Sequence, residues 1–513
     1  MMTYENFIQS PWKRENTHTV YRNSSLSMNP APEYASSEIL LASLYRTIGF
    51  PTVSEGNVPQ NGRELDKKIQ NLKDKNQNPL AGTTVDLDTW HSILHGVLES
   101  PKLPNQSSKR FLQVIPLVPQ LSVFSGSARM SSNSWPAGNL IRRMVWLGSA
   151  NDSEARKLWK DLFEALSVSD DDDVFARWLN EETKYWNSGN DWKLIYPTDA
   201  DLGEINYSAF SKIKFFPARQ FVKDLSSIIH SKNLVTRRQW TSLLESILRV
   251  GAVSHITWIC DIQSRVWKQL NDAIHEKFSL SLDQLSDEIF PVAPQYMTYG
   301  GKALNGIKDK VSAYLAARIG INNLLWGLES INKGFKGNID TPEGVLGLCQ
   351  LVISNRKKLL EANINSTFID LKEKESRALN CKKGIGSNLV EFSRHVLGQR
   401  QTAVLLLRGY DQGYILKKKG VHASSPWVVS LGPVAVLALV HCSLSGMTGP
   451  RSVYRLGQHM AAYGIAVDGR DIARNDLGVQ LRMLGLVLDS PDAESGMLLL
   501  PPFAQINKDS NND

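Results

Sequence analysis

Few side chains in this 513-residue chain are spaced for catalysis. Glu391 and His395 lie four residues apart, so they would share one face of a helix, and a Glu/His pair can transfer protons. The same spacing is equally typical of a pair on a surface helix. Glu391 and His395 are therefore the catalytic candidates of a cryptic metal-dependent nuclease, which is one of three functions considered below.

Two other groups of residues invite comparison with metal sites. Asp170 to Asp173 are consecutive, so they cannot all point at one ion, and before Val174 they suit the positive end of a helix dipole. His91 and His95 are one helical turn apart, but no third ligand is spaced nearby. The chain also has no phosphate-binding loop, no convincing dinucleotide fingerprint and no serine-hydrolase elbow. We expect neither a metal nor a cofactor, and favour a non-enzymatic role.

The residues best suited to nucleic-acid binding lie near the C-terminus. Arg and Gln donate hydrogen bonds to phosphates and to base edges. A helix expected near 471–484, together with the start of the helix before it, would present Arg451, Arg455, Arg470, Arg474, Gln480 and Arg482. The loop that follows, 489–494, has three acidic residues and no basic one, and would oppose binding to phosphate.

A second basic group lies in the middle of the chain. Its members are Lys212, Lys214, Arg219, Lys223, Lys232, Arg237 and Arg238, and Asp224 is the one acidic residue between the first and the last of them. Four aromatic residues are interleaved with this group and could stack on bases: Phe215, Phe216, Phe221 and Trp240. The alternative is that the aromatic residues are core and the charges form a solvated face. Trp240 fits an apolar helix stripe, which favours that alternative.

The C-terminal candidates need a compact domain to position them. Four apolar residues spaced by 4, 4 and 3 predict one face of a helix that Gly485 ends: Ala473, Leu477, Leu481 and Leu484. Two short apolar runs, 486–488 and 497–500, then flank a polar loop and predict a β-hairpin. A helix starting near Pro433 and another at 453–463, capped by Ser452, would complete a winged helix.

The rest of the chain is predicted to be mainly helical. Thr236 and Gln239 form a capping box for a helix, which Gly251 should separate from a second helix at 253–278. Further helices are expected at 307–331, 342–362 and 387–397, and sparse strands at 402–408 and 414–418. The expected fold class is mainly α, a multi-helical body with a C-terminal winged-helix domain of three helices and a β-hairpin.

We divide the chain into six segments. These are a flexible N-terminal arm (1–35), an N-terminal mainly helical domain (36–205), a central helical domain with a basic face (206–375), a connecting region with short strands (376–425), the winged-helix domain (426–505) and a polar tail (506–513).

Composition limits the cellular setting. The net charge of +7 permits a nucleic-acid partner without requiring one. Four widely spaced cysteines without a C-x-x-C pair suit a reducing cytoplasm, and the N-terminus has no apolar signal segment. The charge-free stretch 423–449 is interrupted by Gly432 and Pro433. Its continuous apolar part, 434–440, is much shorter than the roughly 20 residues that a membrane span needs, so we expect a buried core helix there.

The block from Gly413 onward resembles the winged-helix ends of accessory proteins encoded in bacterial anti-phage and restriction-type defence islands. The resemblance rests on GYILKKKG, PWVVSLGPVAVLALVH and IARNDLGVQLRMLGLVLDSPDAESGMLLLPPF, and it covers roughly a fifth of the chain. It implies a non-enzymatic or cryptically enzymatic subunit that works beside an ATPase, nuclease or methyltransferase. The acidic loop departs from the DNA-binding pattern of such domains.

These observations predict a cytoplasmic, non-catalytic subunit of a bacterial multi-protein complex of the anti-phage defence type. It would bind the backbone of duplex DNA and a partner protein. A helical scaffold whose winged helix mediates protein contacts alone is the first alternative, and the cryptic nuclease is the second.

Overall fold

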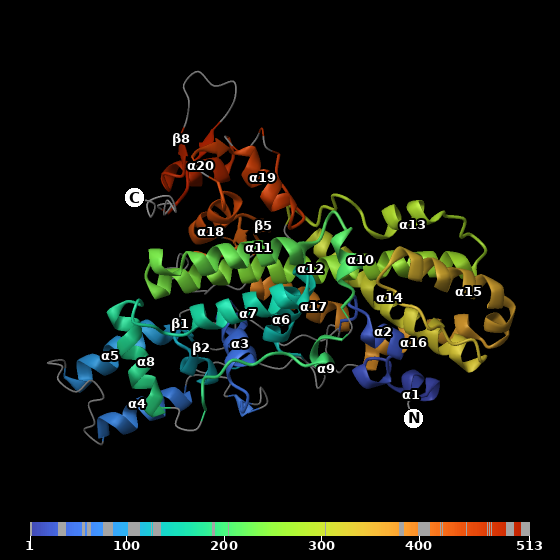
Figure 1. The fold of residues 1–513 in the computed structure, drawn as a ribbon, viewed down its shortest axis with the longest axis horizontal. Coiled ribbons are helices and arrows are strands. Elements are labelled where there is room, and N and C mark those ends of the chain that lie inside the picture. The colour runs from blue at the N-terminus through green and yellow to red at the C-terminus, as the bar shows by residue number, and fades with distance from the viewer. Residues whose placement is uncertain are drawn as a thin grey trace.

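Helices dominate the computed structural model of the chain (Figure 1). The residues that it describes are 3–28, 37–53, 57–58, 63–74, 86–100, 113–124, 126, 135–186, 190–203, 205–302, 304–378, 384–398, 411–420, 422, 424–447, 449–468, 470, 472, 474–488 and 497–503.

The longest helix, α12 (Arg237–Ile274), has 38 residues and runs through the middle of the molecule (Figure 1). Its length is about 57 Å at 1.5 Å per residue. The Thr236–Gln239 capping box is confirmed at its start. One stretch of α12 is long and apolar enough to cross a membrane, but 94% of that stretch is buried inside the protein, as in the core helix of a globular fold.

The expected break at Gly251 is wrong, because α12 continues through it. A Cβ atom at this position would lie 2.5 Å from the Phe221 ring on α11 (Pro217–His230). Gly251 is therefore a packing residue that lets α11 approach α12 closely, and it does not end a helix.

Helices cover both ends of α12. On one side lie α3 (Ser37–Gly49), α6 (Ala137–Gly148) and α7 (Asp152–Leu166), and toward its C-terminal end lie α14 (Asn305–Ser330), α15 (Pro342–Glu361) and α16 (Ile364–Ala378). Helix α17 (Gly384–Val396) contacts α14 and α3 and lies below the middle of α12 in Figure 1. The helices expected at 307–331, 342–362 and 387–397 are confirmed to within a few residues. Short connecting helices are α9 (Asp199–Leu202), α10 (Tyr207–Ser211), η4 (Lys232–Leu234) and α13 (Leu282–Ile289).

Most buried apolar residues form one continuous cluster that extends from Tyr21 to Leu499 and centres on α12. A second, smaller cluster fills the region formed by α4 (Arg63–Asp74), α5 (Leu87–Leu98), α8 (Val174–Trp186), η3 (Pro119–Phe124) and the antiparallel pair β1 (Glu99–Ser100) and β2 (Gln113–Val114).

The N-terminal segment, residues 3–28, is not the flexible arm that its polar composition predicts. It forms α1 (Tyr4–Gln9), η1 (Arg14–Asn16) and α2 (Thr19–Asn23), which lie beside α14. The Tyr4 hydroxyl donates to Asn323 at 2.7 Å, and the His18 backbone amide donates to Asn322 at 2.9 Å. Residues 29–35 of the expected arm lie outside the described residues.

The last part of the chain, residues 433–503, is called the terminal unit below. Its elements are α18 (Pro433–Ser443), β6 (Arg451–Ser452), α19 (Tyr454–Ala461), β7 (Ile465–Ala466), α20 (Asp476–Met483), β8 (Val487–Leu488) and β9 (Leu498–Leu499). Strands β6, β9 and β8 form an antiparallel sheet in that order. The expected helix start at Pro433 and the expected hairpin are confirmed.

Two details of the terminal unit differ from expectation. The N-cap residue of α19 is Val453, and Ser452 belongs to β6, although the Ser452 hydroxyl accepts a hydrogen bond from the Tyr454 amide at 3.4 Å at the start of α19. Helix α20 begins at Asp476 and not near residue 471, because the Asn475 side chain accepts hydrogen bonds from the amides of Leu477 and Gly478 and so caps it there. Gly485, with φ +66°, follows the end of the helix as predicted.

One pair of short strands connects the terminal unit to the body, and a second pair lies just before the unit in the sequence. Strand β7 pairs in parallel with β3 (Met297–Thr298), and β4 (Leu416–Lys418) pairs with β5 (Trp427–Val429). The strand expected at 414–418 is confirmed in β4, whereas 402–408 lies outside the described residues.

Candidate nucleic-acid interface

Helix α20 presents one side to the protein and the other to solvent. Leu477 and Leu481 are fully buried, as the apolar spacing predicts, and Leu484 is half-buried. Ala473 lies outside the described residues. On the opposite side Val479 is 50% exposed and Met483 81% exposed. An exposed methionine of this extent is unusual for a helix without a partner, because methionine is normally a core residue.

The six C-terminal candidates for nucleic-acid binding differ in their exposure to solvent. Arg451, Arg470, Arg474 and Arg482 have exposed side chains, and Arg482 approaches the Met497 sulfur at 3.7 Å. Gln480 is half-buried, and its side-chain oxygen is enclosed, which suits a base edge poorly. The Arg455 Nε donates to the Ser443 carbonyl, so this arginine connects α19 to the end of α18. One of its donors is therefore already engaged within the protein.

Exposed apolar residues accompany these arginines. They are Tyr454, Val479, Met483, Leu488 and Leu498. Leu488 and Leu498 face each other as direct partners in the β8–β9 pair. The acidic loop 489–494 lies outside the described residues. The exposed surface of the terminal unit is therefore a mixture of guanidinium groups and apolar side chains, and not a purely basic surface.

The nucleic-acid role predicted for Arg237 is wrong, because its side chain is only 1% exposed. Its guanidinium pairs with Asp172 at 3.1 Å and donates to the Leu117 carbonyl at 2.6 Å and to the Tyr45 hydroxyl at 3.2 Å. Burial, the largest single influence, raises the pKa of Asp172, but the charges of Arg237 and Lys232 and the hydrogen bonds from Ser169 and Arg237 together hold this pKa below its usual value. Arg237 is a structural anchor.

The other mid-chain cations differ in exposure and are spread along the length of α11. Arg219 is half-buried and donates to the carbonyls of Phe210 and Ile213, and burial lowers its pKa. Lys212, Lys214, Lys223 and Arg238 are exposed. Lys212 and Lys214 precede α11 and Arg238 follows it, so they are separated by about 21 Å, the length of a 14-residue helix.

The aromatic residues of this region are core residues. Phe215, Phe216, Phe221 and Trp240 are all buried, and the Trp240 indole donates to the Ile228 carbonyl at 2.9 Å. They cannot stack on bases. The alternative interpretation, aromatic core with a solvated charged face, is the correct one for these four residues.

Asp224, the acidic residue within the basic group, belongs to a buried polar network. Its carboxylate accepts hydrogen bonds from the Tyr463 hydroxyl at 2.7 Å and from Gln220 at 2.8 Å, and it lies 2.9 Å from the His459 Nε2. Ser254 on α12 also donates to the Tyr463 carbonyl at 2.9 Å. The network fixes α19 to α11 and α12, and sequence spacing gave no indication of it.

The catalytic candidates Glu391 and His395 are not on a surface helix. Their side chains are 5% and 3% exposed, and their nearest atoms, Oε2 and Nε2, lie 3.6 Å apart. Arg394 pairs with Glu391 at 2.6 Å. A substrate cannot reach the pair without local unfolding, so the geometry gives no support to acid–base catalysis there.

The aspartate run before α8 has two structural roles. Asp173 accepts from the Ala176 amide at 3.0 Å, which is the expected interaction at a helix start, and Asp172 pairs with Arg237 and Lys232. Within the described part of the chain, no three His, Cys, Asp or Glu side chains converge as a metal site requires. The side chains of His91 and His95 lie outside that part.

No protein-family model matches the chain, and no curated protein is similar to it. Function is therefore inferred from the residues and their geometry.

Proposed function

We propose that the terminal unit is a winged-helix module and that the protein is a non-catalytic subunit that binds a partner protein through the exposed side of α20. The order α18, β6, α19, α20, β8, β9 with the sheet order β6–β9–β8 supports the winged-helix assignment. The observation that carries the binding role is the exposure of Met483 and Val479 beside Arg474 and Arg482.

The distribution of exposed apolar residues favours a protein partner. Of the 13 large apolar side chains exposed among the described residues, five lie in the terminal unit, which contains 59 of the 418 described residues. Clustered apolar exposure marks interaction sites, and Met, Tyr and Arg are enriched in protein interfaces. Burying Met483 against a partner would contribute roughly 1.5–3 kcal/mol.

The test compares Met483→Glu with Ile369→Glu. Ile369 is 63% exposed on α16, outside the terminal unit, so it is a matched control for placing a carboxylate on an exposed apolar site. We expect a partner protein to co-purify from the native host with the wild type and with Ile369→Glu, and its recovery to be unchanged by nuclease treatment. With Met483→Glu, the amount of partner recovered should fall at least about tenfold. Equal recovery with both variants refutes the proposal.

Binding to the backbone of duplex DNA is the second candidate. The exposed guanidinium groups of Arg451, Arg470, Arg474 and Arg482 favour it. Fluorescence anisotropy with a labelled duplex should then show affinity that falls steeply with salt, as counterion release requires. Arg474→Glu with Arg482→Glu should abolish binding. A flat salt response, or no binding at micromolar protein, excludes this candidate.

A matched control separates the two basic regions. Lys212→Glu with Lys214→Glu makes the same change in charge on the mid-chain surface, where both lysines are exposed. If the terminal unit binds DNA, this pair retains most of the affinity. If the mid-chain pair loses as much affinity as the Arg474/Arg482 pair, the terminal unit is not the specific DNA site.

The cellular setting completes the proposal. The resemblance of the C-terminal block supports a bacterial complex of the anti-phage defence type, with an ATPase, nuclease or methyltransferase as the partner. Cys260, Cys349 and Cys442 are buried free thiols, which supports a reducing cytoplasm. Identification of the co-purified protein by mass spectrometry tests the partner class.

A further inference from the structure

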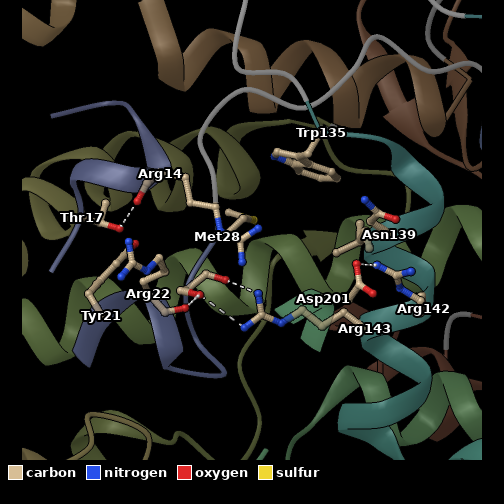
Figure 2. A pocket seen from close by; sticks show the side chains of 12 residues that line it. Arg14, Thr17, Tyr21, Arg22, Met28, Trp135, Asn139, Arg142, Arg143 and Asp201 are labelled. Atoms are coloured by element: carbon tan, nitrogen blue, oxygen red, sulfur yellow. Dashed lines mark hydrogen bonds and ion pairs between the residues drawn. The ribbon is translucent and has the colours of Figure 1, made fainter. Parts of the chain in front are cut away.

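A pocket lies between the N-terminal segment and helices α6 and α9 (Figure 2). It has a volume of about 130 Å³, which is enough for several water molecules or one phosphate group. Three chain regions far apart in the sequence contribute its walls. The charged residues that line it are Arg14, Arg22, Arg142, Arg143 and Asp201, and Trp135 also contributes to its wall.

Positive charge exceeds negative charge around this pocket. Four arginines and one aspartate line it, which leaves a net charge of 4 − 1 = +3. Asp201 is already paired with Arg142, at 2.9 Å. Arg14 is exposed at the opening, and its guanidinium has no hydrogen bond or ion pair within the described part of the chain. The excess charge is therefore not neutralised by the carboxylate of the pocket.

Arg143 is held in place by backbone oxygens. It donates to the carbonyls of Ser24, Ser25 and Ser27 at 2.7–2.9 Å. Figure 2 shows the bond to Ser27. Its Nε is buried and has no hydrogen-bond partner among the described residues. The pKa of Arg143 is lowered to about 10, chiefly by burial. The charge of Asp340 opposes this shift, and the charge of Arg14 adds to it. An anion beside Arg143 would relieve both unfavourable effects.

We propose that this pocket binds a phosphate-bearing small molecule, whose phosphate lies among Arg14, Arg142 and Arg143. A phosphate offers only acceptor oxygens, and guanidinium groups match it with several donors each. The half-exposed Trp135 indole at the edge of the pocket gives a flat apolar surface for the remainder of the molecule. Asn139 adds a further polar group to the wall.

The position of the pocket favours a small molecule over a nucleic acid. In Figure 1, α2, α6 and α9 lie on one side of α12 and the terminal unit lies on the other. A duplex bound to α20 would not face the pocket. This site is therefore additional to the proposed partner-binding surface and shares no residue with it.

Calorimetry on the purified, nucleic-acid-free full chain tests the proposal. The probes are inorganic phosphate, adenosine monophosphate and adenosine. We expect heat of binding with phosphate and with the monophosphate, and none with adenosine. Arg14→Ala should weaken the binding of phosphate and of the monophosphate at least about tenfold, since it removes charge-assisted hydrogen bonds. Lys13→Ala, which removes an exposed charge outside the pocket, should change affinity less than about twofold.

Several outcomes would overturn the proposal. They are absence of binding by phosphate and by the monophosphate, adenosine binding as tightly as its monophosphate, and equal losses in Arg14→Ala and Lys13→Ala. If Arg14→Ala misfolds by circular dichroism, Asn139→Ala replaces it, with a smaller expected loss of about threefold.

Failure of this proposal is separable from failure of the proposed function. Arg14→Ala should leave recovery of the partner protein unchanged, and Met483→Glu should leave phosphate binding unchanged, because the two sites share no residue.

Discussion

Removal of the Asp224 carboxylate should loosen the terminal unit from the body. Asp224→Ala eliminates the acceptor for His459 and Tyr463, two side chains of the terminal unit that lie 2.9 and 2.7 Å from it. Hydrogen bonds to a charged group contribute about 1.5–3 kcal/mol each, so the two together amount to about 3–6 kcal/mol. Tyr463→Phe removes one of them and should cost about half as much.

The loss of stability in Asp224→Ala should be confined to the terminal unit. Hydrogen exchange measured by mass spectrometry reports opening of each segment separately. We expect Asp224→Ala to accelerate exchange in α18 and α19 by at least about a hundredfold while α14 and α15 change little, and Tyr463→Phe to give an intermediate effect. Uniform acceleration across the chain would contradict this reasoning, as would equal effects of the two variants.

Two further predictions concern buried charges. Burial raises the pKa of Glu182 from 4.5 to about 7, so the folded state retains its proton longer than the unfolded state and stability falls as the pH rises from 4.5 through 7. Glu182→Gln should therefore raise the free energy of unfolding by about 2 kcal/mol at pH 8 and change it little at pH 4, in urea titrations; the same gain at both pH values would rule out this origin. Arg237→Ala should lower the free energy of unfolding by about 3–5 kcal/mol because it leaves Asp172 poorly paired, whereas Arg238→Ala should change it by less than about 0.5 kcal/mol. Equal losses in these two variants would show that burial does not distinguish the arginines.

Local sequence signals located most helices correctly. The Thr236–Gln239 capping box, the proline at the start of α18 and Gly485 after α20 each act through their nearest neighbours, so a pattern of a few residues is enough to recognise them. Gly251 shows the limit of this approach. Whether a glycine ends a helix or admits a close neighbour depends on Phe221, thirty residues away.

The candidate site was harder to predict for the same reason. Arg237 and Arg238 are adjacent and chemically identical, but Asp172 pairs with the first, 65 positions earlier in the chain, and the second is exposed. Such pairings cannot be read from local spacing. The exposed side of α20, by contrast, follows directly from helical periodicity once Leu477 and Leu481 are placed inside.

The N-terminal segment also sets an order of events during synthesis. Its docking helix, α14, begins at Asn305, so the ribosome must add about 300 residues before the segment has a place to bind. At translation rates of about 5–20 residues per second, this takes roughly 15–60 s. Phe7 and Tyr21, both buried in the finished protein, remain open to chaperones throughout that interval. Nascent chains that stop before α14 cannot bury these residues against it.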